Sequence, residues 1–239
     1  MESRMEESLE FIDLRTVEER LHGKNSIAHE FVDKRRGWCR SRFIPVDYDE
    51  DGRLLHVIYC IESIDEEKKR ENRLLYLAQT DLMTGLCNRG SGERRINELL
   101  QERTGGLLCL LDCDKFKAVN DTYGHSVGDK VIIAVAESLQ KSCRENDVLL
   151  RLGGDEFAIF MPGLLEQKSA EKFFDRLFEN VGEIAIEEMQ GKHVEISLGA
   201  CFYDGSEFVS FDQLYRNADH AMYQSKKKQG YSATIYDGQ

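Results

Sequence analysis

The sequence lacks several features that would place it in common classes of protein. Its 239 residues contain no apolar stretch near the roughly 20 residues that span a bilayer, so we expect no direct membrane insertion. The polar, acidic first residues do not have the pattern of a signal peptide. A formal net charge of −12 excludes a broad nucleic-acid surface, so no nucleic acid is expected as a partner.

Paired cysteines are also missing. The sequence has 7 cysteines but no Cys-x-x-Cys pair, and Cys60, Cys109 and Cys201 lie inside apolar runs. This pattern favours reduced, buried thiols in a cytoplasmic protein. Cys109 and Cys113 have the spacing of one strand face, but a zinc site needs more ligands than the sequence offers beside them.

Residues 1–64 have the pattern of a small sheet. A helix is expected over 9–21, and strands are expected over 27–32, 38–46 and 54–64. The run Asp-Glu-Asp-Gly at 49–52 is typical of a hairpin turn between the last two strands. Such a sheet exposes an edge and an apolar face, so we expect it to pair with a partner or to be a piece of a larger domain.

Residues 65–79 predict a charged linker helix, with a coiled coil and a plain connector both open. From residue 80 to 239 helices alternate with strands, which indicates a sheet with helices on one face. Helices are expected over 90–102, 127–143, 167–181 and 211–228. Strands are expected over 107–111, 147–152, 157–161, 193–202 and 234–236.

The most informative run is Arg-Leu-Gly-Gly-Asp-Glu-Phe at 151–157, which predicts the tip of a hairpin. Gly153 and Gly154 let a bulky ligand approach the backbone. Asp155 and Glu156 can hold a metal ion or accept a proton. The same composition is common in ordinary turns, so the run alone does not distinguish a site from a turn.

A second group of carboxylates follows the apolar strand predicted at 107–111. If the hairpin lies on a neighbouring strand, Asp112 and Asp155 converge on one cation. Carboxylate oxygens are ligands of magnesium and leave room for substrate phosphates. Polymerases and cyclases use this arrangement for nucleotidyl transfer. The alternative is a pair of strand ends whose aspartates are simply solvated.

Asn120 and Asp129 follow this cluster and together can recognise the edge of a guanine. An asparagine amide offers both an acceptor and a donor, and a carboxylate accepts from the ring N–H and the exocyclic amine. Asp129 is also expected in the first turn of the helix over 127–143, where an acidic residue is favoured without any ligand.

Residues 80 to about 237 resemble a GGDEF domain, the diguanylate cyclase family. The resemblance rests on the long, ordered runs at 81–89, 112–117, 120–121, 123–125, 128–129, 153–157, 197–200 and 217–223. It implies an α+β fold of the palm-like nucleotidyl-cyclase type, with a mostly antiparallel central sheet and flanking helices. Residues 1–64 resemble the C-terminal half of a PAS domain, on Gly37-Trp38, the Asp-Gly turn and the run Ser-Ile-Asp-Glu at 63–66.

The family resemblance implies a homodimer that joins two GTP molecules into cyclic di-GMP and releases two pyrophosphates, with Mg²⁺ or Mn²⁺ as cofactor. By this likeness Asp112 and Asp155 ligate the metal through carboxylates, and Cys113 ligates it through its backbone carbonyl. Asp155 and Glu156 are the candidates for the base that activates the ribose hydroxyl. The remaining substrate contacts implied are Gly153 and Gly154 (clearance for the nucleotide), Asn120 and Asp129 (guanine), and Lys117, Lys226 and the amides near Lys115 and Phe116 (phosphates).

The sequence departs from the family near its last helix. The family usually has Lys-x-x-Gly-Arg there; Lys226 matches the lysine, but Gly230 stands at the arginine position. Lys227 or Lys228 can substitute, although a lysine supplies a point charge and not a planar fork. We therefore expect weaker phosphate binding without loss of function.

Arg144 and Asp147 form an Arg-x-x-Asp pattern, with five residues between Asp147 and Gly153. This resembles the family's inhibitory site, in which the arginine and the aspartate bind the product. It implies feedback inhibition by cyclic di-GMP. Three other interpretations stay open: a GTP or cyclic di-GMP receptor without turnover, a cyclase that takes ATP in one half-site, and a chain whose N-terminal part mainly dimerises.

Overall fold

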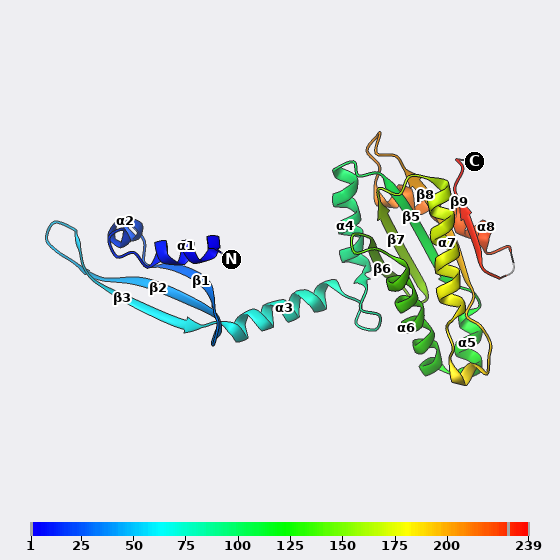
Figure 1. Cartoon of the computed structure of the whole chain (residues 1–239), viewed down its shortest axis with the longest axis horizontal. Coiled ribbons are helices and arrows are strands. Elements are labelled where there is room, and N and C mark those ends of the chain that lie inside the picture. Colours follow the sequence, from blue (N-terminus) through cyan, green and yellow to red (C-terminus); the bar gives the residue numbers. More distant parts are fainter. Residues whose placement is uncertain (1, 229, 239) are drawn as a thin grey trace. The chain divides into compact units, whose positions relative to one another are not determined.

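The structure is a computed structural model, and it describes residues 2–228 and 230–238 (Figure 1). The chain divides into two compact units, Met1–Leu75 and Tyr76–Gln239. No helix in the described residues is both long and apolar enough to cross a membrane.

The first unit contains a three-stranded antiparallel sheet in the order β1-β2-β3. Its elements are α1 (Glu2–Phe11), α2 (Val17–Leu21), β1 (Ile27–Asp33), β2 (Gly37–Tyr48) and β3 (Leu54–Ser63). The three predicted strands are therefore confirmed. The single helix expected over 9–21 is wrong, because the Asp13 carboxylate accepts the backbone N–H of Arg15 at 3.0 Å and its guanidinium at 2.8 Å. Such side-chain bonds offer the backbone a turn in place of a helix.

The core of this first unit is small. Its hydrophobic cluster contains three buried residues, Val17, Leu21 and Phe43, and Cys39 and Ile64 are buried outside that cluster. Strand register puts Tyr59 opposite Phe43 and Ile61 opposite Ser41, so both lie on the face that the helices partly cover. Tyr59 and Ile61 nevertheless stay 42% and 48% exposed. Leu54 and Val57 pack against the core, but the helices leave the rest of β3 exposed, as expected for a partial sheet.

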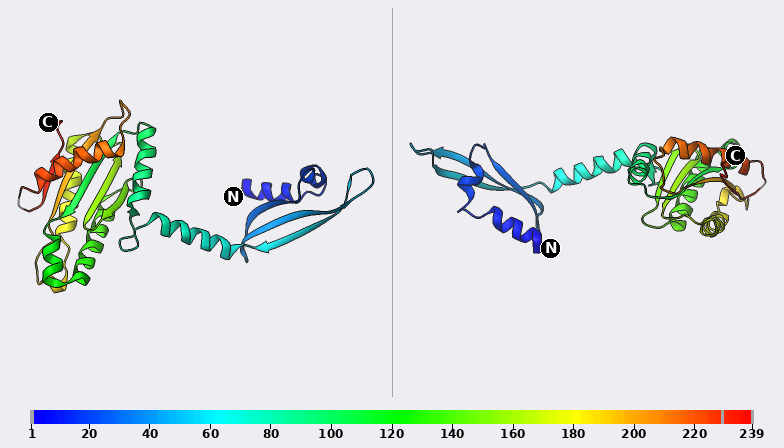
Figure 2. Two further views of the ribbon diagram at one scale, coloured as in Figure 1. Left: turned by 180° about the vertical axis from the view of Figure 1, so that it is seen from behind. Right: turned by 90° about the horizontal axis from the view of Figure 1, so that it is seen from above.

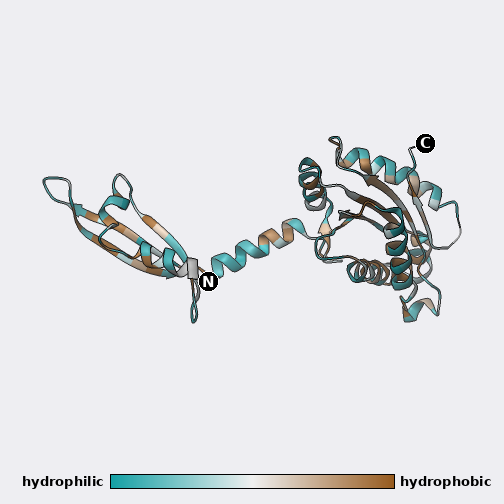
Figure 3. Cartoon of the chain, turned by 45° about the horizontal axis from the view of Figure 1, so that its top comes forward, coloured by the Kyte–Doolittle hydropathy of each residue, from teal (hydrophilic) through white to brown (hydrophobic). Residues whose placement is uncertain are grey.

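Helix α3 (Asp65–Gln79) follows β3 and buries none of its side chains. Its first half is polar and its last half apolar, as the colours of Figure 3 show. Leu74, Leu75 and Leu77 are all more than one third exposed. The structure confirms the helix predicted over 65–79; its role as a linker and a coiled coil through these leucines stay predictions.

The second unit is built on a six-stranded sheet in the order β4-β6-β7-β5-β8-β9. The strands are β4 (Cys87–Asn88), β6 (Val148–Gly153), β7 (Glu156–Pro162), β5 (Gly106–Cys113), β8 (Ile196–Tyr203) and β9 (Ser232–Ile235). The central pairs are antiparallel, and only β4–β6 and β8–β9 are parallel. This confirms the α+β class with a mostly antiparallel sheet.

Helices cover both faces of this sheet, as the two views of Figure 2 show. They are α4 (Arg89–Gln101) and α8 (Phe211–Ser225) on one side, and α6 (His125–Ser142) and α7 (Gln167–Gly182) on the other. The expectation of helices on one face is therefore wrong. Alternate residues of β5 enter two separate cores: Leu107 and Cys109 belong to one, Leu108 and Leu110 to the other. A continuously apolar strand requires cover on both sides.

Helix α5 (Phe116–Tyr123) was not expected, and α6 begins at His125, two residues earlier than predicted. Gly124 separates the two helices at a φ of 86°, in the left-handed region that favours glycine. Asp129 consequently lies beyond the first turn of α6, so the predicted dipole role for it there is wrong. Helix α7 is followed by a short 3₁₀ turn at Glu187–Met189.

Candidate active site at the strand tips

Two neighbouring strands bring the predicted carboxylates together. Strand β5 pairs with β7, and in that register Asp112 stands directly opposite Glu156. The β6–β7 hairpin turns through Gly154 and Asp155, immediately before Glu156. The predicted placement of the hairpin on a strand beside Asp112 is thus confirmed.

The hairpin tip is open to solvent at its two glycines. A Cβ at Gly153 or Gly154 would meet no heavy atom within 4 Å. Gly154 has a φ of 56° and Gly153 a φ of 152°, so the turn uses backbone conformations that other residues adopt with strain. The open space beside the tip leaves room for a bulky ligand to reach the backbone.

The carboxylates are close enough to perturb one another. Burial raises the pKa of Asp155, and the charge of Asp112 raises it further. Burial also raises the pKa of Glu156, followed by the charges of Asp112 and Asp155. The three groups therefore form one acidic cluster that favours a bound cation.

Lys226 supplies a cation to this cluster. Its ammonium lies 2.8 Å from the Oδ2 atom of Asp112, whose side chain is 14% exposed. Burial opposes the charge on Lys226, but the bond to Asp112 and the nearby carboxylate charges together outweigh it, so the pKa of Lys226 is raised. Lys227 instead lies over the ring of Tyr223, and Lys228 donates to Thr234.

The donor set around Asp112 suits a hard divalent cation that is shared with a substrate. No group of three or more His, Cys, Asp or Glu side chains among the described residues forms a metal cage by itself. Two carboxylates and a backbone carbonyl leave positions for water and phosphate oxygens, as magnesium prefers. The thiol of Cys113 is buried and burial raises its pKa, so only the backbone of this residue suits a metal.

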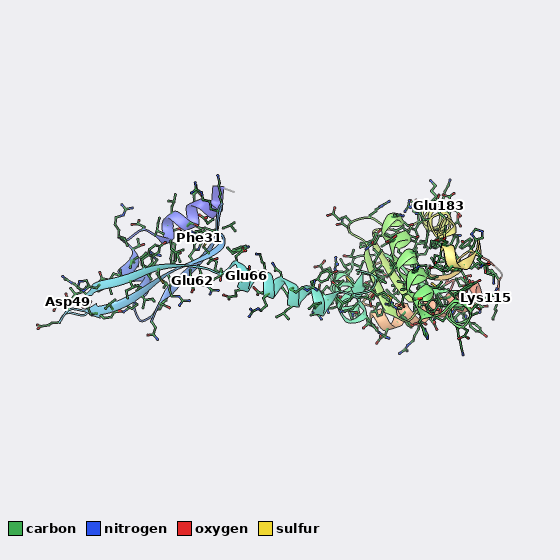
Figure 4. All side chains as sticks on the ribbon, turned by 90° about the horizontal axis from the view of Figure 1, so that it is seen from below. Phe31, Asp49, Glu62, Glu66, Lys115 and Glu183 are labelled. Atoms are coloured by element: carbon green, nitrogen blue, oxygen red, sulfur yellow. The ribbon has the colours of Figure 1, made fainter. Side chains whose placement is uncertain are left out.

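The predicted phosphate contacts lie where β5 passes into α5. Lys115 has a φ of 58°, a left-handed conformation for a residue with a side chain, and α5 begins at Phe116. The first N–H groups of a helix have no partner within it and can bind an anion. The side chain of Lys115, labelled in Figure 4, is 80% exposed, and its ammonium lies 3.9 Å from the Glu195 carboxylate. Lys117 is exposed as well.

Helices α5 and α6 bring the two predicted guanine contacts near each other. A Cβ at Gly128 would lie 2.0 Å from the Oδ1 atom of Asn120, so only glycine allows this approach. Asp129 follows directly and is exposed. The motif glycine thus has a packing reason, and it places Asn120 beside the backbone that carries Asp129.

Arg144 and Asp147 lie apart from the carboxylates. They precede β6, whereas Asp155 follows it, and a six-residue strand spans about 20 Å. The Asp147 carboxylate accepts the backbone N–H of Arg144 at 2.7 Å. Both residues line a pocket of about 530 Å³ together with Lys172 and Arg176 of α7.

Sequence reasoning missed three residues around these sites. Lys172 and Arg176 add two cations to the pocket of Arg144, and their i, i+4 spacing on a helix was the available signal. Arg151 was noted only as part of the glycine run. Its guanidinium donates to the carbonyl oxygen of Gly154 at 2.7 and 3.0 Å and pairs with Asp81.

Comparisons with known proteins point to one family. Residues 78–232 match the family model described as "Diguanylate cyclase, GGDEF domain". The diguanylate cyclase DgcM of Escherichia coli K12 is 29% identical over 212 residues, which are 86% of this chain and 49% of that protein. The chain therefore spans about half the length of this curated relative.

Two solved structures share the fold of the second unit. The GGDEF domain of PA1120 (TpbB or YfiN) from Pseudomonas aeruginosa superposes with a TM-score of 0.60 at 29% identity, covering 66% of this chain and 94% of that one. The coiled coil and GGDEF domain of DgcB from Caulobacter crescentus, solved with c-di-GMP, gives a TM-score of 0.63 at 25% identity, covering 72% and 93%.

Proposed function

The chain belongs to the GGDEF family, and from that premise we propose that it is a metal-dependent diguanylate cyclase that works as a homodimer. The observation that carries the proposal is the pairing of Asp112 with Glu156 across β5 and β7, beside the open turn of Gly153 and Gly154. In this cluster Lys226 pairs with Asp112, and the adjoining turn at Gly153 and Gly154 has open space beside its backbone.

Each residue then has a defined task. Asp112, Asp155 and the carbonyl of Cys113 hold Mg²⁺ or Mn²⁺, which neutralises phosphate charge and lowers the pKa of the attacking hydroxyl. Lys226, Lys117 and the amides at Lys115 and Phe116 bind the phosphates. Asn120 and Asp129 bind guanine.

Asp155 and Glu156 are the two groups suited to accept the proton of the ribose hydroxyl. Both have a raised pKa, which brings a carboxylate closer to the pH at which it works as a base. Most of the rate enhancement comes from positioning the two nucleotides and neutralising their charge.

A homodimer follows from the chemistry of the product. Cyclic di-GMP contains two equivalent phosphodiester bonds, so two GTP molecules must each supply a hydroxyl and an α-phosphate. One hairpin tip per chain offers one nucleotide site, and two chains related by a two-fold axis place two such sites face to face.

The missing arginine weakens this site without removing it. Gly230 stands at the expected arginine position, and neither Lys227 nor Lys228 has its ammonium at the carboxylate cluster. Lys226 therefore carries most of the side-chain contact to phosphate. This departure favours a second candidate function, a GTP or cyclic di-GMP receptor with little turnover.

We further propose that Arg144 and Asp147 bind the product and inhibit the enzyme. Three cationic side chains (Arg144, Lys172 and Arg176) and two carboxylates (Asp147 and Glu166) line their pocket, and the excess of cations suits an anionic dinucleotide. Arg144→Ala is expected to relieve inhibition by cyclic di-GMP, and an unchanged inhibition curve would exclude this site.

One assay separates these functions: incubation with GTP and Mg²⁺, followed by detection of pyrophosphate and a cyclic dinucleotide. A cyclase forms both, and a receptor binds nucleotide without forming either. ATP added with GTP tests the mixed product. Asp155→Ala and Glu156→Ala should abolish synthesis while the protein stays folded, and normal product from either variant would contradict the assignment.

The role of the first unit stays a proposal. We infer that residues 1–64 act as a PAS-like input segment and that α3 passes its state to the cyclase domain. The enzyme is expected to act in the cytoplasm, where GTP is available.

A further inference from the structure

The motif Asp-Leu-Met-Thr-Gly-Leu-Cys-Asn-Arg at 81–89 has no task in the proposed chemistry, although it is a long run shared with the family. The structure places its first residue against the catalytic hairpin. The Asp81 carboxylate pairs with the Nη1 atom of Arg151 at 3.2 and 3.3 Å. The two side chains are 25% and 13% exposed, so solvent screens this pair less than a surface ion pair.

Arg151 also binds the β6–β7 turn directly. Its Nε and Nη2 atoms donate to the carbonyl oxygen of Gly154 at 3.0 and 2.7 Å. That carbonyl and the N–H of Asp155 belong to one planar peptide unit. Because Gly154 adopts a φ of 56°, which glycine leaves easily, an external contact is needed to fix the direction of this peptide. Arg151 supplies that contact.

Asp81 is fixed from its other side. Its carboxylate also accepts the backbone N–H of Thr84 at 3.0 Å and the hydroxyl of Thr84 at 2.7 Å. Two backbone bonds close the same loop, from Asp81 to Leu86 and from Gly85 to Asp81. The bonds from Thr84 and Arg151 outweigh the effect of burial and keep the pKa of Asp81 low, so it stays ionised.

The start of α4, which follows this loop, binds the C-terminal end of α3. The Nδ2 atom of Asn88 donates to the carbonyl oxygen of Ala78 at 2.8 Å, and the hydroxyl of Ser91 donates to the carbonyl oxygen of Gln79. These carbonyls are the last ones of α3 and have no partner within the helix. Polar contacts therefore run from the end of α3 through the loop and Arg151 to the catalytic turn.

We propose that Arg151 is a positioning residue for Asp155 and that the Asp81–Arg151 pair transmits the state of the α3 terminus to the catalytic turn. The functional part of this inference rests on the proposed cyclase activity. The physical part, the coupling between two segments, is independent of turnover and can be measured alone.

The competing explanation is that Asp81 only stabilises its own loop. Asp81→Asn tests this, because the amide still accepts from Thr84 but loses the ion pair with Arg151. Thr84→Val is the matched control, since it removes a bond to the same carboxylate and keeps Arg151 in place. We expect Asp81→Asn to lower kcat about tenfold or more with KM for GTP nearly unchanged, and Thr84→Val to stay within about twofold of wild type.

The contact between the end of α3 and the segment that follows it is tested with Asn88→Asp. Aspartate still accepts the N–H of Ser91 as the helix cap, as Asn88 does at 3.0 Å, but it cannot donate to Ala78. Amide hydrogen exchange at 153–157 is the readout. We expect exchange to quicken about threefold or more in Asn88→Asp and in Asp81→Asn, and to stay at the wild-type rate in Thr84→Val.

A double variant that combines Asn88→Asp with Arg151→Met tests whether the coupling passes through Arg151. If coupling passes through Arg151, Asn88→Asp has no further effect on exchange once Arg151 is gone, so the two changes are not additive. Additive effects, or wild-type exchange at 153–157 in Asp81→Asn, would overturn the inference. Absence of product from the wild-type protein would instead reject the cyclase assignment, and the exchange data would still decide the coupling.

Discussion

The two sheets of this chain differ in how completely they are covered. In the six-stranded sheet, β5 and β8 are buried along nearly their whole length on both faces. In the three-stranded sheet, β3 has no fully buried residue and its outer edge has no strand partner in the described part of the chain. The six-stranded sheet is fully covered and can support charged groups at the ends of its strands. The three-stranded sheet is incompletely covered and needs a further surface to pack against.

This contrast matters for function because buried charges need a rigid support. The raised pKa values of Asp155 and Glu156 mean that the fold keeps both carboxylates where they are destabilising. A tightly packed sheet behind the tips can offset that effect. The small cluster of Val17, Leu21 and Phe43 in the first unit provides no comparable stabilisation from packing.

The largest change in the free energy of unfolding is expected in the core of the six-stranded sheet. Ile159 of β7 is fully buried, so Ile159→Ala should lower the free energy of unfolding of the second unit by about 2–5 kcal/mol. Denaturant unfolding followed separately for each unit measures this loss. A loss below about 1 kcal/mol would show that this sheet is less tightly packed than described.

An intermediate effect on stability is expected at the β6–β7 turn, where Asp155 lies. Asp155 has a raised pKa in the folded state, so its charge destabilises the fold fully above that pKa, and the penalty disappears below the ordinary value of 3.8. Asp155→Asn should therefore raise the melting temperature at neutral pH without metal while abolishing synthesis. The gain should shrink as the pH falls. A lower melting temperature at neutral pH would mean that Asp155 stabilises the fold.

The smallest change in the free energy of unfolding is expected for a substitution in β3. This change would also respond most strongly to a partner that covers the strand. Ile61 is 48% exposed, so Ile61→Ala in an isolated chain should change the free energy of unfolding by less than about 0.5 kcal/mol. A loss comparable to that of Ile159→Ala would show that something covers this strand in solution. Repeating the measurement over a range of protein concentrations distinguishes a second copy from a cover within the chain.

Much of this structure was predictable because its signals are local. The glycine run, the apolar strand before Asp112 and the linker helix all follow from residue types and period. The cover on both faces of the sheet was missed, although the unbroken apolar run at 107–111 was its signal. Helix α5 was missed because Lys115 enters it through a left-handed conformation that no propensity predicts.

The contacts of Arg151 were not predictable for another reason. Asp81 and Arg151 are 70 residues apart, and nothing in either local pattern specifies the pairing. The pocket of Arg144 likewise gains Lys172 and Arg176 only when α7 packs against α6. Residues that act across elements need the fold before their partners can be named.

The most direct test of the central claim is to place a metal at the strand tips without relying on turnover. Mn²⁺ added with a non-reactive GTP analogue should broaden the backbone amide signals of Asp112, Cys113 and Asp155 in an NMR spectrum, and leave those around Arg144 sharp. Asp112→Asn should remove the broadening. Broadening centred on other residues, or none at saturating Mn²⁺, would contradict a shared metal and nucleotide site at these carboxylates.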